Sequence, residues 1–249
     1  MNKEKPIGVF DSGIGGVTIL KEILKILPNE DYVYYSDSIN NPYGDRSKSE
    51  IISICKNNVD FLLNKNCKII VVACNTACTI AINSLREAFP DIKFVGIEPA
   101  YKMVHDCNQD EETLVMATKG TIESERFNFL YHKYDNHKTH LLSCVGLADI
   151  IEEGNEEKLD TYLKDNIKEY GGKVKNIVLG CTHYPLIVDK LKSFLGEVRF
   201  FEGSNRVAVH LKEVLEEEGL LNLNGTSKID FTDSSNSELK KERFFKILN

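Results

Sequence analysis

Short apolar runs alternate with longer amphipathic stretches along this chain, and that alternation narrows the folds open to it. The apolar runs are rich in Val, Ile and Tyr and are too short for helices, so the first half is expected to form strands at 7–10, 32–37, 68–73 and 93–97. Helices are expected between them, at 17–27, 47–64 and 76–89. Strands that alternate with helices form parallel sheets with right-handed crossovers. The sequence therefore predicts an α/β fold.

The same pattern starts again in the second half. Strands are expected at 113–118, 139–144, 176–181 and 198–203, and helices at 124–134, 146–153, 157–170 and 185–195. The polar stretch 105–112 is expected to be a loop. The tail from residue 224 onwards is polar, and we expect it to dock Phe244, Phe245 and Ile247 on the body.

The two halves match in the spacing of polar groups at their strand ends. Cys74 follows Asp11 by 63 positions, and Cys181 follows Thr118 by 63 positions. Each half thus has one strand leading into a small polar loop and another leading into a cysteine. This favours two similar parallel-sheet α/β domains related by pseudo-twofold symmetry, with the two cysteines on opposite sides of a shared cleft.

Composition limits the function classes. The 249 residues are 42% hydrophobic and carry a formal net charge of -7, as in a soluble globular protein with a proper core. An acidic balance gives no electrostatic reason to expect nucleic acid or an anionic membrane as partner. The first residues lack the apolar segment of a signal peptide, and no apolar run is long enough for a membrane span, so a cytoplasmic protein is expected. Seven cysteines, an odd number, make a disulfide framework unlikely to be the organising device.

Either cysteine taken alone fits a buried core residue, but two at equivalent strand ends favour a reactive pair. A helix N-terminus lowers the pKa of a thiol, so Cys74 is expected to be activated as a thiolate. Zinc is disfavoured, because the spacing of Cys74 with Cys78 and of Cys181 with His183 is not that of a structural site. Cys78 reads more simply as the core face of the helix.

Four further features leave two interpretations each. The "FDSGIGG" loop is either a turn capped by Asp11 or an anion-binding loop whose glycines allow a ligand close to the backbone. Its spacing matches neither a dinucleotide fingerprint nor a P-loop. The turn with Tyr43 either lies capped on the surface or covers a ligand. His183 is either a satisfied core histidine or a group that orients and protonates. The acidic stretch 150–157 is either solvated at a helix end or turns one of Glu152 and Glu153 towards a cleft.

Taken together, "FDSGIGG", "PYGDRS", "VVACNTA", "GIEPA", "ATKGTIESERF" and "LGCTHYPL" resemble the glutamate racemases of the aspartate/glutamate racemase superfamily in order and spacing, from about Pro6 to Val207. The resemblance implies two α/β domains, residues 1–98 with 208–249 and residues 99–207, with the active site between them. It implies interconversion of L- and D-glutamate without pyridoxal phosphate, metal or nucleotide, a supply of D-glutamate for peptidoglycan, and a homodimer.

The resemblance also carries residue roles. It implies Cys74 and Cys181 as the two acid/base thiols, assisted by Asp11, Glu152 and His183. It implies substrate contacts at Asp11, Ser12, Tyr43, Gly44, Asn75, Thr76, Thr118, Thr121, Thr182 and His183.

The chain departs from the family's pattern at three places. Val145 and Asp149 stand where prolines are usual, and Glu202-Gly203 stands where an Asp-Ser or Asp-Pro is usual. These positions put local geometry in question, and with it the substrate range. A racemase for aspartate or another amino acid is the alternative within the superfamily. A non-catalytic binder of acidic ligands is the alternative outside it, although such a binder needs neither thiol.

Overall fold

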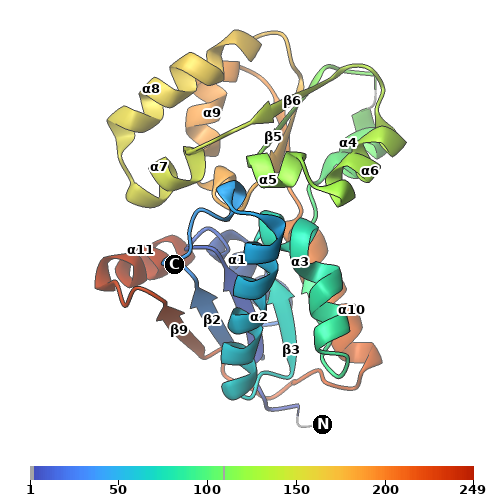
Figure 1. The fold of residues 1–249 in the computed structure, drawn as a ribbon, viewed down its shortest axis with the longest axis vertical. Helices are drawn as coiled ribbons and strands as arrows, with labels where there is room; N and C mark the ends of the chain where they lie inside the picture. Colours follow the sequence, from blue (N-terminus) through green and yellow to red (C-terminus); the bar gives the residue numbers. More distant parts are fainter. Residues whose placement is uncertain (1–2, 109) are drawn as a thin grey trace.

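The molecule has two halves, one above the other in Figure 1, and each consists of a parallel β-sheet with its own helices. The structure is a computed structural model that describes residues 3–108 and 110–249. The first sheet has the strand order β4-β3-β1-β2-β9, and every pair in it is parallel. Its strands are β1 (Ile7–Asp11), β2 (Tyr32–Ser36), β3 (Ile69–Val72), β4 (Phe94–Gly96) and β9 (Ile229–Asp233).

The second sheet repeats the arrangement of the first. Its order is β6-β5-β7-β8, again parallel throughout. Its strands are β5 (Thr113–Ala117), β6 (Thr139–Ser143), β7 (Asn176–Gly180) and β8 (Arg199–Phe201). When each half is numbered from its own first strand, both sheets read 2-1-3-4, with β9 added at the edge of the first. The predicted fold class, two similar parallel-sheet α/β domains, is confirmed.

The helices flank the sheet of their own half. With the first sheet lie α1 (Val17–Ile26), α2 (Lys48–Asn64), α3 (Asn75–Ala88), α10 (Ser204–Glu217) and α11 (Glu238–Leu248). With the second lie α4 (Tyr101–Asn108), α5 (Lys119–Ile122), α6 (Glu125–Tyr134), α7 (Leu147–Glu153), α8 (Glu156–Asn166) and α9 (Val188–Leu195). Short 3₁₀ turns are η1 (Tyr43–Asp45), η2 (Lys168–Tyr170) and η3 (Tyr184–Ile187). None of the helices in the described part of the chain has both the length and the apolar run that crossing a membrane requires.

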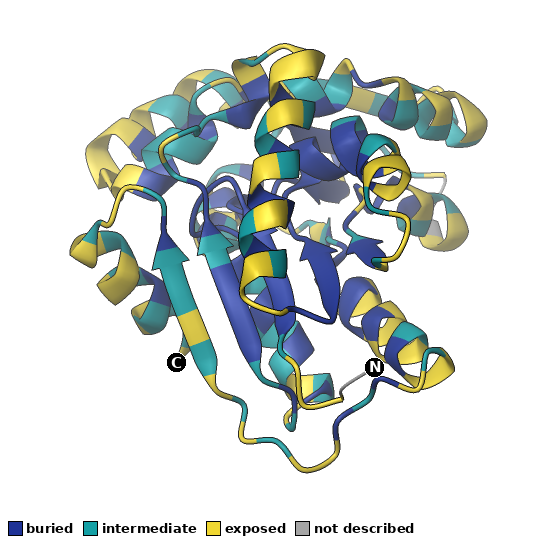
Figure 2. Cartoon of the chain, turned by 60° about the horizontal axis from the view of Figure 1, so that its bottom comes forward, coloured by how far each residue is buried: buried dark blue, intermediate teal, exposed yellow. Residues whose placement is uncertain are grey.

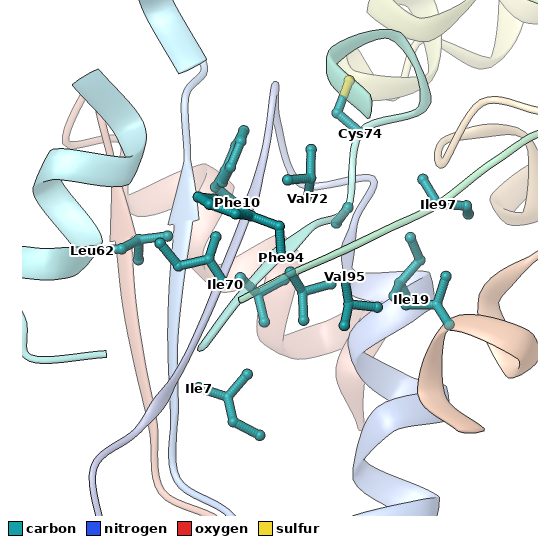
Figure 3. Packing of buried hydrophobic residues seen from close by; sticks show 14 of the residues in the cluster. Ile7, Phe10, Ile19, Leu62, Ile70, Val72, Cys74, Phe94, Val95 and Ile97 are labelled. Carbon is teal, nitrogen blue, oxygen red and sulfur yellow. The ribbon is translucent and has the colours of Figure 1, made fainter. Parts of the chain in front are cut away.

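The strands of the first sheet are the core of their half. β1 and β3 are buried along their whole length, whereas the edge strand β9 is partly exposed (Figure 2). Fully buried strands with Val and Ile on both faces are expected where helices cover both sides of a parallel sheet. The packed cluster runs from Ile7 at one end of β1 to Cys74, which follows β3 (Figure 3). The core thus ends in a thiol at the edge of the sheet that faces the other domain.

Two sequence predictions were wrong in detail. The stretch 105–112 is not a loop throughout, because α4 extends to Asn108; residue 109 lies outside the described residues. The helix forms because Tyr101 and Val104, one turn apart, bury an apolar face with strand residues such as Val115. The helix predicted at 157–170 ends at Asn166 and continues as a 3₁₀ turn.

The C-terminal segment completes the first half. α10 packs on α1, β9 pairs with β2, and the predicted docking of the last aromatic residues is confirmed, with Phe244 buried between Tyr34 and Phe231. Neither α10 nor β9 was predicted. The division into domains at 98/99 and 207/208 stays a prediction, and its second point falls within α10.

Candidate active site

The loops that follow the central strands of both sheets meet at one place. Cys74 begins α3 as its N-cap, and its Sγ accepts a hydrogen bond from the backbone N–H of Ala77 at 3.5 Å. Its thiol donates to Ser12 Oγ at 3.7 Å, in the loop after β1. Both Cys74 and Ser12 are buried. A parallel sheet brings the carboxyl ends of neighbouring strands together, which is why residues 62 positions apart touch here.

Cys181 occupies the equivalent place in the second half, directly after β7. Its Sγ lies 3.8 Å from His183 Nδ1. Between them in sequence, Thr182 Oγ1 donates across the domain boundary to both carboxylate oxygens of Asp11, each at 3.4 Å. Asp11 also accepts the Gly16 N–H at 2.9 Å. The two strand-end cysteines, which are 5% and 8% exposed, therefore belong to one buried interface between the domains.

The expectation that a helix N-terminus makes Cys74 a thiolate was wrong for this closed arrangement. Burial raises the pKa of the Cys74 thiol well above its ordinary value, and the Asp11 carboxylate nearby raises it further. The Ala77 N–H hydrogen bond acts in the opposite direction but does not outweigh them. Burial also raises the pKa of Asp11, more than the charge of His183 lowers it. Cys74 and Asp11 thus form a pair that favours holding protons.

His183 and Glu152 form a buried ion pair beside Cys181. His183 Nε2 lies 2.6 Å from Glu152 Oε2, and the carboxylate also accepts the Ile14 N–H from the first domain at 3.3 Å. Burial alone would lower the pKa of His183, but the hydrogen bonds to Cys181 and Glu152 raise it well above its ordinary value. Burial would likewise raise the pKa of Glu152, yet His183 lowers it to about 2. The imidazole is therefore held as a cation next to one of the two thiols.

The glycines of the "FDSGIGG" loop let the second domain approach the first. A Cβ at Gly15 would lie 2.6 Å from His183 Nδ1, and one at Gly13 would lie 2.8 Å from Glu152 Oε2. Both distances are below van der Waals contact, so only glycine fits. In this structure side chains of the other domain approach the loop closely, and the predicted approach of a ligand stays a prediction. The anion at the Ile14 amide is the carboxylate of Glu152.

Three threonines close the opposite side of the interface. Thr76 Oγ1 lies 2.8 Å from Thr118 Oγ1 and 3.3 Å from Thr121 Oγ1, and Thr118 donates to Thr121 at 3.0 Å. A Cβ at Gly44 would meet Thr118 at 2.9 Å, so the turn after β2 also touches the second domain. The Tyr43 hydroxyl donates to Asp37 and accepts from Asn58 within its own domain. The predicted substrate contacts of Tyr43 and Gly44 stay predictions.

Asn75 stands out because its side chain has no partner. It is 2% exposed, and neither its Nδ2 nor its Oδ1 is hydrogen-bonded within the part of the chain that the structure describes. A buried amide without a partner is unfavourable by about 1–3 kcal/mol. This is expected of a group that a polar ligand satisfies when it enters between the domains.

Comparison with known proteins identifies the architecture. A family model described as Asp/Glu/Hydantoin racemase matches residues 16–211. The chain belongs to the Asp/Glu/Hydantoin racemase family. A curated relative, the glutamate racemase of Clostridium perfringens (strain SM101 / Type A), is 40% identical over 99% of this chain and 91% of its own length.

Solved structures agree with that assignment. The glutamate racemase of Francisella tularensis, in complex with D-glutamate, superposes with a TM-score of 0.82 at 30% identity, over 99% of this chain and 94% of that one. The Escherichia coli glutamate racemase, in complex with L-glutamate and an activator, gives a TM-score of 0.83 at 26% identity, over 98% and 94%. The chain is thus an amino-acid racemase of the glutamate racemase type.

The departures from the racemase pattern have structural accounts in two of three places. Asp149 Oδ1 accepts a hydrogen bond from Asn41 Nδ2 of the first domain at 2.6 Å. Glu202 Oε2 accepts the Ser204 N–H at 2.7 Å and so caps the start of α10. Val145 is exposed, and nothing in the structure explains it.

Sequence reasoning left one choice open and missed two residues of this racemase. Glu152 faces His183, whereas Glu153 is exposed and pairs with Lys158. Lys240 Nζ lies 3.3 Å from Glu152 Oε1, although it stands in the polar tail that sequence reasoning set aside. Arg243, on the same helix, donates to the backbone oxygens of Ile151 and Glu152. A basic pair spaced three apart on a C-terminal helix was the only signal for them.

No group of three or more His, Cys, Asp or Glu side chains is placed to hold a metal ion among residues 3–108 and 110–249. All seven cysteines are free thiols. Cys78 is buried on the core face of α3, as predicted.

The ion pair predicts a pH dependence of stability. Glu152, lowered from 4.5, contributes stability above pH 4.5 that is lost as the pH falls towards about 2. His183, raised from 6.5, contributes stability below pH 6.5 that is lost as the pH rises through its raised pKa. Glu152→Gln is therefore expected to lower the free energy of unfolding most between about pH 4.5 and 6.5, by about 3 kcal/mol.

Urea unfolding across the pH range measures that difference. Glu153→Gln is the matched control, because the same substitution one residue away touches only an exposed pair. An equal, pH-independent effect of both substitutions contradicts the prediction.

Proposed function

We propose that this chain interconverts L- and D-glutamate by moving a proton between Cα and two thiols, Cys74 and Cys181, without pyridoxal phosphate, metal or nucleotide. The observation that carries the proposal is the pair of buried cysteines at equivalent strand ends of two facing domains. Racemisation removes the Cα proton from one face and returns a proton to the other. One acid/base group on each side of a closed interface suits that reaction.

The proton balance follows from the two thiols. In one direction the Cys181 thiolate takes the Cα proton, and Cys74, which holds its proton, donates to the opposite face. In the other direction the roles exchange. After each turnover the thiol that began as thiolate holds a proton and the other has lost one. Before the enzyme can act in the same direction again, the first thiol must lose its proton and the second must regain one.

The neighbours of the thiols differ, and the difference suits the two roles. His183, held as a cation by Glu152, lies 3.8 Å from Cys181 Sγ and is the charged partner of that thiol. Asp11, whose pKa burial raises and whose charge raises the pKa of Cys74, is assigned to accept or relay a proton of that thiol. Thr182 links the two sides through its hydrogen bonds to Asp11.

Binding of the substrate carboxylates needs neutral donors in a dry site. Such donors are present on both domains: Ser12, Asn75, Thr76, Thr121 and Thr182 are buried and Thr118 is half-buried. The partnerless amide of Asn75 gains most from a ligand, because it exchanges no existing hydrogen bond for the new one. Donors fixed in place before the reaction stabilise the developing negative charge without reorganisation.

A solvent exchange experiment tests the proposal. L-glutamate, D-glutamate and L-aspartate are incubated separately in D₂O with metal-free protein and no pyridoxal phosphate. We expect both glutamate enantiomers to lose optical activity and to gain deuterium at Cα, since the donated proton comes from solvent. Turnover of aspartate instead of glutamate supports the racemase for aspartate, and binding without exchange supports a non-catalytic binder; either result overturns the proposal.

The cellular setting follows from the same proposal. We infer that the product D-glutamate supplies peptidoglycan synthesis, that the enzyme works in the cytoplasm and that it forms a homodimer. We also keep the division into residues 1–98 with 208–249 and residues 99–207 as the two bodies that open to admit glutamate. Limited proteolysis near residues 98 and 207, with and without glutamate, checks that division.

A further inference from the structure

The C-terminal helix α11 reaches across the domain interface to the end of α7. α11 belongs to the first half, where it packs on α1 and β9, while α7 carries Glu152 in the second half (Figure 1). Two basic side chains of α11 make the contact, Lys240 in its first turn and Arg243 one turn further on. Neither Lys240 nor Arg243 takes part in the proposed proton transfer.

The two oxygens of Glu152 have different partners. Oε2 pairs with His183 Nε2 at 2.6 Å, Oε1 pairs with Lys240 Nζ at 3.3 Å, and the Ile14 N–H lies 3.3 Å from both. A carboxylate held at both oxygens cannot rotate away from the imidazole without losing a charged partner. Lys240 is thus placed to fix the orientation of Glu152, although it does not touch His183.

Arg243 acts on the main chain of the same helix end. Its guanidinium donates to the backbone oxygens of Ile151 and Glu152, in the last turn of α7. The Ile151 oxygen also accepts the N–H of the capping residue Gly154 at 3.1 Å, so the guanidinium adds a second donor to this helix end. A cation there also suits the negative end of the helix dipole. Gly154, with φ of 71°, ends the helix directly against this guanidinium.

We propose that Lys240 and Arg243 are positioning residues for the Glu152–His183 pair: Lys240 fixes the carboxylate, and Arg243 fixes the helix end that carries it. Through His183 they act on the Cys181 side of the site and leave Cys74 unaffected. The inference rests on the proposed racemisation, because it assigns the two cations a part in that reaction.

The effect of a substitution on the pKa of Glu152 depends on the charged groups around this carboxylate. The titratable and charged groups that act on Glu152 or feel its charge are His183, Lys240, Asp11, Asp149, Tyr34 and Arg243. Of these, His183 and Lys240 lower the pKa of Glu152. Removing the Lys240 charge therefore raises that pKa, while the other groups are unchanged.

Lys240→Met tests the proposal, with Lys241→Met as the matched control. Lys241 is the next residue on α11, and it pairs only weakly with Glu238 on the surface at 3.7 Å. We expect Lys240→Met to lower kcat about fivefold, the size expected for a charge-assisted contact that is partly exposed. KM is expected to stay within about twofold of the wild-type value, because Lys240 acts on the reacting groups and does not touch the substrate. The ratio of kcat at pH 5 to kcat at pH 8 is expected to fall in Lys240→Met and to stay unchanged in Lys241→Met. Arg243→Met is expected to lower kcat alike at both pH values, because it loosens the helix end without removing a charge that lowers the pKa of Glu152.

A second readout does not depend on turnover. Carbon-13 NMR of the Glu152 carboxyl group is expected to show a higher pKa in Lys240→Met than in Lys241→Met. Lys240→Arg is expected to restore both kcat and that pKa, which a loss of packing alone would not explain. The proposal is overturned if Lys240→Met and Lys241→Met share the same pKa of Glu152, or if Lys240→Arg is as impaired as Lys240→Met. Failure of the wild type to racemise glutamate overturns the proposed function, whereas the NMR comparison still decides the placement of Lys240.

Discussion

Cys74→Ala and Cys181→Ala are each expected to lower kcat for glutamate racemisation by about a thousandfold or more, in both directions. General acid–base catalysis by one positioned group contributes about 10²–10⁴-fold, and here each turnover needs both groups. Alanine keeps the Cβ and removes only the sulfur, so the domains still close. Chiral separation of the products after incubation with each enantiomer measures the loss. Because the two enantiomers are equally stable, kcat/KM must fall equally in the two directions.

Cys78→Ala is the matched control for Cys74→Ala. Cys78 lies one turn along the same helix and is also buried, with its pKa raised by burial as that of Cys74 is, but it faces the core of the first domain. We expect a small loss of stability and unchanged kcat from Cys78→Ala. Near-normal turnover in either Cys74→Ala or Cys181→Ala would refute the two-thiol reaction while leaving the fold assignment untouched.

The alternating pattern was enough to predict the strands of both sheets except β9, and to predict that both cysteines follow a strand. Short runs of apolar residues predict the strands Ile69–Val72 and Asn176–Gly180, because a strand buried on both faces must be apolar throughout. The carboxyl ends of such strands share one edge. The two halves, in which the cysteine follows the polar loop by the same 63 positions, also have the same strand order.

The protonation of Cys74 could not be predicted in the same way. A local rule, the effect of a helix N-terminus on a thiol, pointed to a thiolate. Burial and the charge of Asp11, which lies in the same half, overrule it. The burial depends on how the second domain covers the first. The contact between Glu152 and Lys240 could not be predicted from the sequence either, because 88 positions separate the two residues. Only the packing of α11 brings them together.

Gly15→Ala is expected to lower kcat/KM about ten- to a hundredfold while the first domain stays folded. The added Cβ would lie 2.6 Å from Nδ1 of His183, whose ring is 1% exposed and is held at Nε2 by Glu152. The backbone itself accepts alanine, because Gly15 is not among the glycines with positive φ. Overpacking of this kind is unfavourable by about 1–3 kcal/mol, and it is relieved either by turning His183 away from Cys181 or by holding the domains apart.

Gly8→Ala separates that effect from a general loss of stability. A Cβ at Gly8 would also be crowded, at 3.1 Å from Cys67 Sγ and Leu62 Cδ1, but all of these atoms lie inside the first domain. Gly8→Ala is therefore expected to lower the Tm and leave kcat/KM near that of the wild type at temperatures where it is folded. Gly15→Ala is expected to do the reverse, because the crowded atoms belong to the two sides of the closing interface. Equal kinetic effects of the two substitutions would mean that the glycine loop serves only the fold of its own domain. A selective effect of Gly15→Ala would mean that the glycines exist so that the imidazole beside Cys181 can reach the loop after β1.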